Sequence, residues 1–188
     1  MENQQTLPAP MPGNVTVDNH GTGLTLSYRW FSYKFIFLVF FCIFWDGFLV
    51  FWYSQALSGN APLMMILFPL LHVGVGVGLT YYTVAGFVNR TIVDVTREGI
   101  TIHHAPLPWP GNKTVPAFEI TQLYREEVIS RSNRGTNVRY RLSAISRDNK
   151  KIKLISGIDA ADVALFLEQE IEKWLNIKNV PVTGEMPK

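Results

Sequence analysis

Two long apolar stretches decide the fold of this chain. Residues 35–53 read FIFLVFFCIFWDGFLVFWY with one formal charge, and residues 62–87 read PLMMILFPLLHVGVGVGLTYYTVAGF with none. About 18 apolar residues are enough for a helix to cross a hydrocarbon layer of ~30 Å. A chain of 188 residues holds too little polar sequence to cover both stretches as core helices. The sequence therefore predicts a transmembrane helical hairpin over residues 30–88, with its first helix at about 31–53 and its second at 62–87.

Flanking charges predict how the hairpin is oriented. Cations lie on the two sides away from the connecting loop: Arg29 and Lys34, then Arg90 and Arg97. The loop itself, residues 54–61, holds no Lys or Arg. Because short cationic flanks stay in the cytoplasm, we expect a multi-pass protein of the inner (cytoplasmic) membrane. Both termini would then be cytoplasmic, with the loop outside.

Two polar residues inside the apolar stretches, Asp46 and His72, need a partner in lipid. On antiparallel helices that rise about 1.5 Å per residue, their depths in the membrane are similar. An ionisable group that is left unpaired in lipid costs several kcal/mol. We therefore predict that Asp46 and His72 form a hydrogen bond or ion pair that holds the hairpin together. The alternatives are a proton or ion path and a docking point for a partner's polar residue.

Small residues in the second stretch predict close helix packing. Gly74 and Gly78 form a small-xxx-small pair, and Gly76 and Gly86 add to the same kind of surface. We assign Gly74 and Gly78 to the contact between the two helices of one hairpin. The alternative is the seam of a homo-oligomer. Pro69 is expected to kink the second helix, because it lacks the N–H of one ladder bond.

Shorter alternating segments on both sides of the hairpin predict β-strands. Residues 14–29 combine alternating apolar residues with turn residues, so they are expected to form one or two strands. These strands would pair with a cytoplasmic domain at 89–177, in which residues 137–147 alternate most clearly. Residues 1–13 are expected to be a disordered tail and residues 178–188 a flexible tail.

An amphipathic helix is predicted at residues 160–177, with Asp159 as its N-cap. Its apolar residues recur at helical spacing and should pack on the sheet. They are Val163, Phe166, Leu167, Ile171, Trp174 and Leu175. The predicted fold class is thus a membrane α-helical hairpin plus an α+β domain.

Three segments carry a resemblance to a known family. They read NRTIVDVTREGITI from Asn89, PLPWPGNKTVPAFEITQLY from Pro106 and IKLISGIDAADV from Ile152. Residues 89–175 resemble the bacterial pleckstrin-homology-like (PH-like) domains that are found next to pairs of transmembrane helices. The resemblance implies an antiparallel sheet or barrel closed by a C-terminal amphipathic helix. It also implies a binding or scaffolding role, and no reaction.

The domain carries two candidate binding features. One is a basic patch on a solvent face of the sheet: Arg131, Arg134, Arg139, Arg141, Lys151 and Lys153. A cation near anionic lipid contributes about 1 kcal/mol, so the patch predicts a lipid contact. The alternative is an ordinary solvated face. The second feature is Trp109 between two prolines, interpreted as a lid on the sheet or as a partner contact.

No motif predicts catalysis, a cofactor or a metal site. Cys42 is the single cysteine, and the adjacent His103 and His104 would point to opposite faces of a strand. The net charge of +2 argues against nucleic-acid binding.

We therefore expect a non-enzymatic, membrane-anchored scaffold or assembly factor. Its domain and hairpin would dock a protein partner, a membrane complex or a second copy of the chain. One alternative is a reader of anionic lipid at the cytoplasmic leaflet, which would use the basic sheet face. Another is an ion-coupled transport subunit that uses Asp46 and His72.

Overall fold

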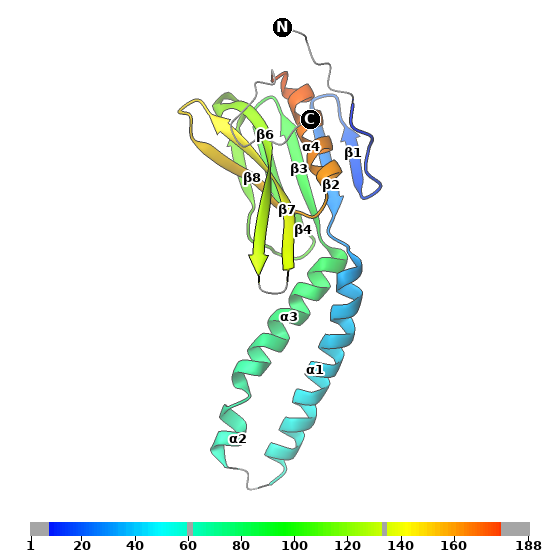
Figure 1. Cartoon of the computed structure of the whole chain (residues 1–188), viewed down its shortest axis with the longest axis vertical. Helices are drawn as coiled ribbons and strands as arrows, with labels where there is room; N and C mark the ends of the chain where they lie inside the picture. The colour runs from blue at the N-terminus through cyan, green and yellow to red at the C-terminus, as the bar shows by residue number, and fades with distance from the viewer. Residues whose placement is uncertain (1–7, 60–61, 133–134, 178–188) are drawn as a thin grey trace. The chain divides into compact units, whose positions relative to one another are not determined.

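The computed structural model describes most of the chain (Figure 1). The described residues are 8–59, 62–132 and 135–177. Three sequence-based predictions lie wholly or mostly outside them: the flexible tail at 178–188, the disordered tail at 1–13, and the contribution of Arg134 to the basic patch.

The described chain folds as two compact units. The first, called the β unit, joins residues 8–29 to residues 90–177. The second, called the helical unit, comprises Trp30–Asn89. The β unit is therefore built from two segments, one on each side of the helical unit in the sequence.

Sheet A of the β unit has five antiparallel strands in the order β1-β2-β3-β4-β5. Its strands are β1 (Val15–Asn19), β2 (Gly23–Arg29), β3 (Arg90–Thr96), β4 (Gly99–Ala105) and β5 (Lys113–Pro116). Strand β2 pairs with β3 along its whole length, from Gly23 opposite Thr96 to Arg29 opposite Arg90. This pairing joins the sequence before the helical unit to the sequence after it.

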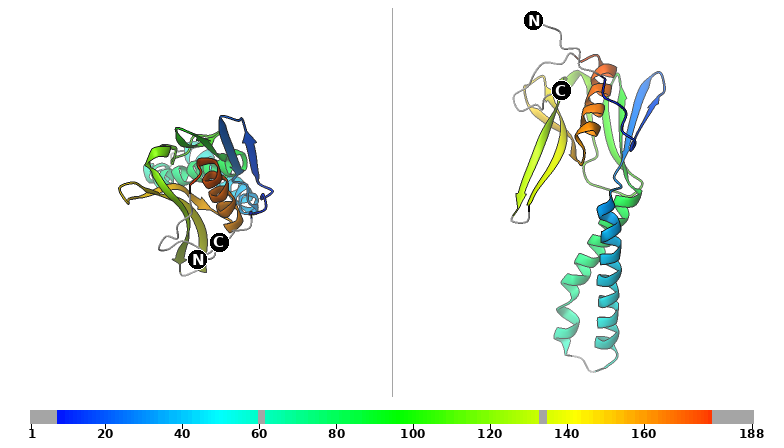
Figure 2. Two further views of the ribbon diagram at one scale, coloured as in Figure 1. Left: turned by 90° about the horizontal axis from the view of Figure 1, so that it is seen from above. Right: turned by 45° about the vertical axis from the view of Figure 1, so that its right-hand side comes forward.

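Sheet B has three antiparallel strands in the order β6-β7-β8. Its strands are β6 (Ile120–Ser132), β7 (Gly135–Ser146) and β8 (Lys151–Ile158). Strand β8 pairs with β7 only from Tyr140 to Ile145, so β6 and β7 continue beyond it as a two-stranded ribbon (Figure 2). A bulge at Leu154 lets both Leu154 and Ile155 be buried.

The two sheets do not close into a barrel. After β5, the chain passes from Pro116 into a short 3-10 helix, η1 (Ala117–Glu119), and no ladder joins β5 to β6 among the described strands. A barrel needs continuous pairing around its circumference, and Pro116 has no N–H to contribute at this point. The predicted antiparallel sheet is confirmed, and the barrel is wrong.

The helix α4 (Ala161–Leu175) packs its apolar stripe on the sheets, with Val163, Leu167 and Ile171 buried. Its N-cap is Ala160 and not the predicted Asp159. The predicted stripe also leaves out two buried carboxylates of this helix, Glu168 and Glu172. Burial of Glu168 follows from an ion pair, because its Oε2 lies 3.0 Å from Nε of the buried Arg125 in β6. A buried charge requires such a partner.

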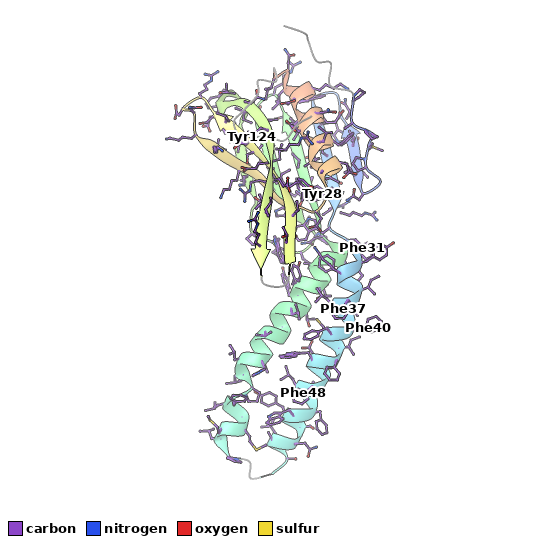
Figure 3. The ribbon with its side chains drawn as sticks, in the orientation of Figure 1. Tyr28, Phe31, Phe37, Phe40, Phe48 and Tyr124 are labelled. Carbon is purple, nitrogen blue, oxygen red and sulfur yellow. The ribbon has the colours of Figure 1, made fainter. Side chains whose placement is uncertain are left out.

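The helical unit contains α1 (Tyr33–Leu57), α2 (Leu63–Leu67) and α3 (Leu70–Val88). Both α1 and the segment Leu63–Val88 are long and apolar enough to cross a membrane. Within their most apolar windows only 17% and 11% of the residues are buried, whereas the core helix of a soluble protein would be mostly buried. Large apolar side chains are instead exposed along α1, among them those labelled in Figure 3: Phe37, Phe40 and Phe48.

Candidate functional site

Pro69 divides the second apolar segment into α2 and α3. Because its nitrogen carries no hydrogen, the carbonyl of Met65 loses its usual donor four residues later. Nε1 of Trp52 donates to this carbonyl at 3.0 Å, and the hydroxyl of Tyr53 donates to the carbonyl of Ile66 at 3.0 Å. Donors from a neighbouring helix are what make a proline break tolerable in lipid. Two aromatic residues of α1 thus satisfy acceptors at the break.

Close approach of α1 and α3 depends on two glycines. A Cβ atom at Gly86 would lie 2.0 Å from Cε1 of Phe35, and a Cβ atom at Gly76 would lie 2.5 Å from Oδ1 of Asp46. Neither distance is sterically possible without movement. Small residues at such positions let helix backbones pack closely.

The glycines assigned from sequence to this contact, Gly74 and Gly78, do not make it. A Cβ atom at either position would have no neighbour within 4 Å among the described residues. With 3.6 residues per turn, positions two residues from Gly76 point to nearly the opposite side of the helix. The assignment of Gly74 and Gly78 to the hairpin interface is therefore wrong, and their role in an oligomer seam stays a prediction.

Asp46 is held by Thr80 and not by the predicted His72. The hydroxyl of Thr80 donates to Oδ2 of Asp46 at 2.7 Å. Each Cα–Cβ bond tilts toward the N-terminus of its own helix. On antiparallel helices, Asp46 and His72 therefore extend in opposite directions, although their depths are similar. Depth alone supported the predicted pair, and the structure does not bring the two side chains together.

His72 instead lies in a stack of aromatic rings. Its ring centroid is 5.8 Å from that of Trp45 and 5.5 Å from that of Phe68, and the rings of Trp45 and Phe41 are 5.6 Å apart. Nε1 of Trp45 also donates to the carbonyl of His72 at 3.2 Å. This geometry gives the imidazole a packing role. It offers no support to an ion path that needs Asp46 and His72 in contact.

A groove of about 460 Å³ opens beside Asp46 in the helical unit. Its lining residues are Asp46, Leu49, Val50, Tyr53, Ser54, Leu57, Val73 and Val77. Most of this lining is apolar, and no lining residue carries a positive charge. Thr80 satisfies one oxygen of Asp46, whereas an ionised carboxylate accepts several hydrogen bonds. The groove can therefore accept an apolar segment that brings a polar donor or a cation to Asp46.

Four of the six predicted patch cations share one face of sheet B. Arg139 and Arg141 alternate on β7, and Lys151 and Lys153 of β8 stand opposite residues of that same face. Arg131 belongs to the other face, because it is Val128 that pairs with Arg139. The predicted basic patch is thus a four-cation face among the described residues.

Carboxylates accompany two of these four cations. Nη1 of Arg141 lies 3.2 Å from Oε1 of Glu126, and Nε of Arg139 lies 3.9 Å from Oδ1 of Asp159. Lys151 lies over the ring of the buried Tyr124, with its Nζ 5.4 Å from the centroid. The net positive field of this face is weaker than the sequence suggests.

The histidines of β4 point to opposite faces, as adjacent strand residues must. His103 lies 3.6 Å from Asp94, whereas Nδ1 of His104 is 3.0 Å from the hydroxyl of Thr91. Burial, together with the nearby His103 and Lys113, lowers the pKa of His104. Across the part of the chain that the structure describes, no three potential metal ligands gather.

Trp109, the last candidate from the sequence, is half-buried in the loop between β4 and β5. Two contacts were not predicted at all: the Thr80 hydroxyl at Asp46 and the Arg125–Glu168 ion pair. The directions in which helical side chains point could have suggested Thr80. No local pattern marks Arg125, since its partner is distant in sequence. No family model and no curated protein sequence matches this chain.

Proposed function

We propose that this chain is a non-enzymatic, membrane-anchored scaffold or assembly factor whose helical unit binds a transmembrane helix of a partner protein. Support comes from one observation above all: the apolar groove that ends at Asp46. A carboxylate at membrane depth is favourable only beside donors or cations. A partner helix with a Lys, Arg or hydroxyl side chain at that depth would supply one. Its apolar face would fill the rest of the groove.

The β unit extends this role into the cytoplasm. Cationic flanks at Arg29, Lys34 and Arg90 favour an inner-membrane location with both termini inside. Two antiparallel sheets with α4 packed on them are compatible with the PH-like resemblance. In this proposal the β unit is a PH-like interaction domain tethered at the membrane surface, and it has no catalytic role.

Site-specific photo-crosslinking in native membranes tests the groove. A photoreactive amino acid at Val50, which lines the groove, should yield one discrete protein adduct. The same group at Phe44 is a matched control, because Phe44 is exposed to a similar degree (75% against 71%) and does not line the groove. Asp46→Asn keeps the shape and removes the charge, so the Val50 adduct should fall at least several-fold. Identical products from Val50 and Phe44, or an adduct indifferent to Asp46→Asn, would contradict the proposal.

A second candidate function is the reading of anionic lipid through the four-cation face of sheet B. Its support is the shared face of Arg139, Arg141, Lys151 and Lys153. Against it stand the carboxylates beside the two arginines. Replacing both lysines by Gln should reduce the preference of the full chain for anionic over neutral nanodiscs. An unchanged preference would contradict lipid reading by this face and leave the binding of a partner helix in the groove as the supported function.

A further inference from the structure

We propose that the β6–β7 ribbon is a second membrane contact, which lies in the headgroup region of the anionic leaflet. The occupant of its exposed apolar surface is thus a lipid bilayer. This inference rests on the membrane anchoring proposed above and adds a site that anchoring does not require. The residues that carry it are Ile129, Arg131, Val138 and Arg139.

An apolar pair is exposed on the ribbon. Ile129 of β6 stands directly opposite Val138 of β7, and the two are 51% and 36% exposed. They lie on the same face as Leu123 and Leu142, which are completely buried where α4 packs on the sheet. Because Ile129 and Val138 are exposed, the core face of sheet B continues uncovered along the ribbon.

The ribbon's charge is cationic throughout. The ribbon comprises residues 128–139, whose sequence holds three arginines and no Asp or Glu. Arg131 shares the face of the apolar pair, and Arg139 follows Val138 on the opposite face of the ribbon. A cation close to an anionic leaflet contributes about 1 kcal/mol, and apolar side chains gain by entering the boundary between headgroups and acyl chains. Cations beside exposed aliphatic residues match that interface better than they match a neutral protein surface.

The direction of the ribbon within the β unit favours a bilayer as its partner. Figure 1 and the right-hand view of Figure 2 show that the end of β6 and the start of β7 lie at the same end of the unit as the end of β2 and the start of β3. Only Trp30, Phe31 and Ser32 lie between β2 and α1, and only Asn89 lies between α3 and β3. That end of the β unit is therefore the one tethered to the apolar helices. The cytoplasmic orientation would bring it to the leaflet that carries anionic lipid.

The test uses the full chain in nanodiscs of phosphatidylcholine alone or mixed with phosphatidylglycerol. Ser130→Cys in a Cys42→Ala background accepts a polarity-sensitive fluorophore and leaves the apolar pair intact. Spin-labelled lipid then reports contact by quenching. A label at Thr114→Cys, on β5 of sheet A, is the matched control. We expect strong quenching at residue 130 in the anionic discs, several-fold weaker quenching in the neutral discs, and little at residue 114.

Two variants separate charge from apolar contact. Arg131→Gln with Arg139→Gln should lower the ratio of lipid-bound to free ribbon by roughly thirtyfold, because two cations contribute about 2 kcal/mol together. Ile129→Ser should reduce quenching at low salt, where the ribbon is bound, although both arginines are kept. Equal quenching at residues 130 and 114 in anionic discs would overturn the proposal. The proposal would also be overturned if the label at residue 130 were shielded from water in native membranes and not in the nanodiscs. That result would instead indicate a protein partner.

High salt distinguishes this inference from the anchoring on which it rests. Salt should release the ribbon, because its attraction to the leaflet is electrostatic, while the chain stays in the disc. A chain that leaves the disc in high salt refutes the proposed anchoring. A chain that stays in the disc, yet shows no quenching at residue 130 in low salt, refutes only the ribbon contact.

Discussion

At Pro69 a single missing N–H is compensated from the other helix. Trp52→Phe removes the donor to the Met65 carbonyl, so we expect α1 and α3 to separate more often. Cys42 reports this opening, because its thiol is buried at the interface 3.6 Å from the hydroxyl of Thr83. An interhelical hydrogen bond in lipid is worth about 0.6 to 1.7 kcal/mol, so labelling by N-ethylmaleimide should accelerate roughly three- to twentyfold.

Pro69→Ala supplies the control for this residue-scale prediction. Alanine restores the N–H that pairs with Met65, so the carbonyl no longer depends on Trp52. In the Pro69→Ala background, Trp52→Phe should therefore change the labelling rate of Cys42 much less. An equal acceleration in both backgrounds would show that Trp52 stabilises the hairpin by packing alone.

His104 makes the β unit sensitive to mild acid. Its pKa is lowered in the folded state by burial and by the neighbouring His103 and Lys113. The unfolded chain therefore takes up a proton at higher pH than the folded chain does. The stability that neutral His104 contributes is fully present above about pH 6.5, and it is lost as the pH falls toward the folded-state pKa.

Thermal unfolding of the full chain in detergent measures this effect. The midpoint of the β unit should fall between about pH 7 and pH 5, the range in which a histidine titrates. His104→Gln should remove the part of this decrease in the unfolding midpoint that His104 causes. His103→Gln should leave most of the decrease in place, because burial is the largest cause of the lowered pKa of His104. A pH profile that is the same in the His104 variant would refute the assignment.

At the scale of elements, the helix interface makes a prediction about glycines. Gly86→Ala places a methyl group against the ring of Phe35, which is itself packed against Tyr82 and Phe87. Overpacking of this kind costs typically about 1 to 3 kcal/mol, so Cys42 should be labelled at least several-fold faster. Gly78→Ala is the matched control, with open space at its Cβ. If Gly78→Ala opened the hairpin equally, a contact with a second copy would be the explanation.

Sequence periodicity predicts elements better than it predicts which faces meet. The alternation of Val138, Tyr140 and Leu142 is sufficient to predict β7, because a half-buried strand repeats every two residues. Gly74 and Gly78 have the spacing of a helix contact, yet Gly76 faces α1. Which side of a helix meets its partner depends on the register between the two helices, and no local pattern encodes that register.

The same limit applies to the sites. Asp46 stands out in the sequence because a carboxylate in an apolar stretch is costly. Its partner does not stand out, since a threonine hydroxyl is tolerated anywhere in a membrane helix. Similar depth in the membrane favoured His72 as the partner of Asp46. The tilt of the Cα–Cβ bonds instead directs Asp46 toward Thr80. Arg125 and Glu168 meet only because α4 packs on sheet B, which is a tertiary event.

At the scale of the whole molecule, the distribution of cations predicts one orientation. Arg29, Lys34 and Arg90 flank the apolar helices, whereas the described part of the loop before α2 carries no charge. Gly59→Cys in a Cys42→Ala background should therefore react with a membrane-impermeant maleimide on intact cells. Thr114→Cys in the β unit should react only after the membrane is permeabilised.

Orientation also decides whether the other proposals can hold together. The ribbon needs an anionic leaflet, and the surface potential of the cytoplasmic leaflet supplies it. If Thr114→Cys were labelled on intact cells and Gly59→Cys were not, the β unit would face outward and the ribbon would lose that attraction. The Asp46 groove would survive such an inversion, because a helix partner at membrane depth is available from either side. Labelling at these two positions therefore tests the lipid contact and the groove as separate properties of one chain.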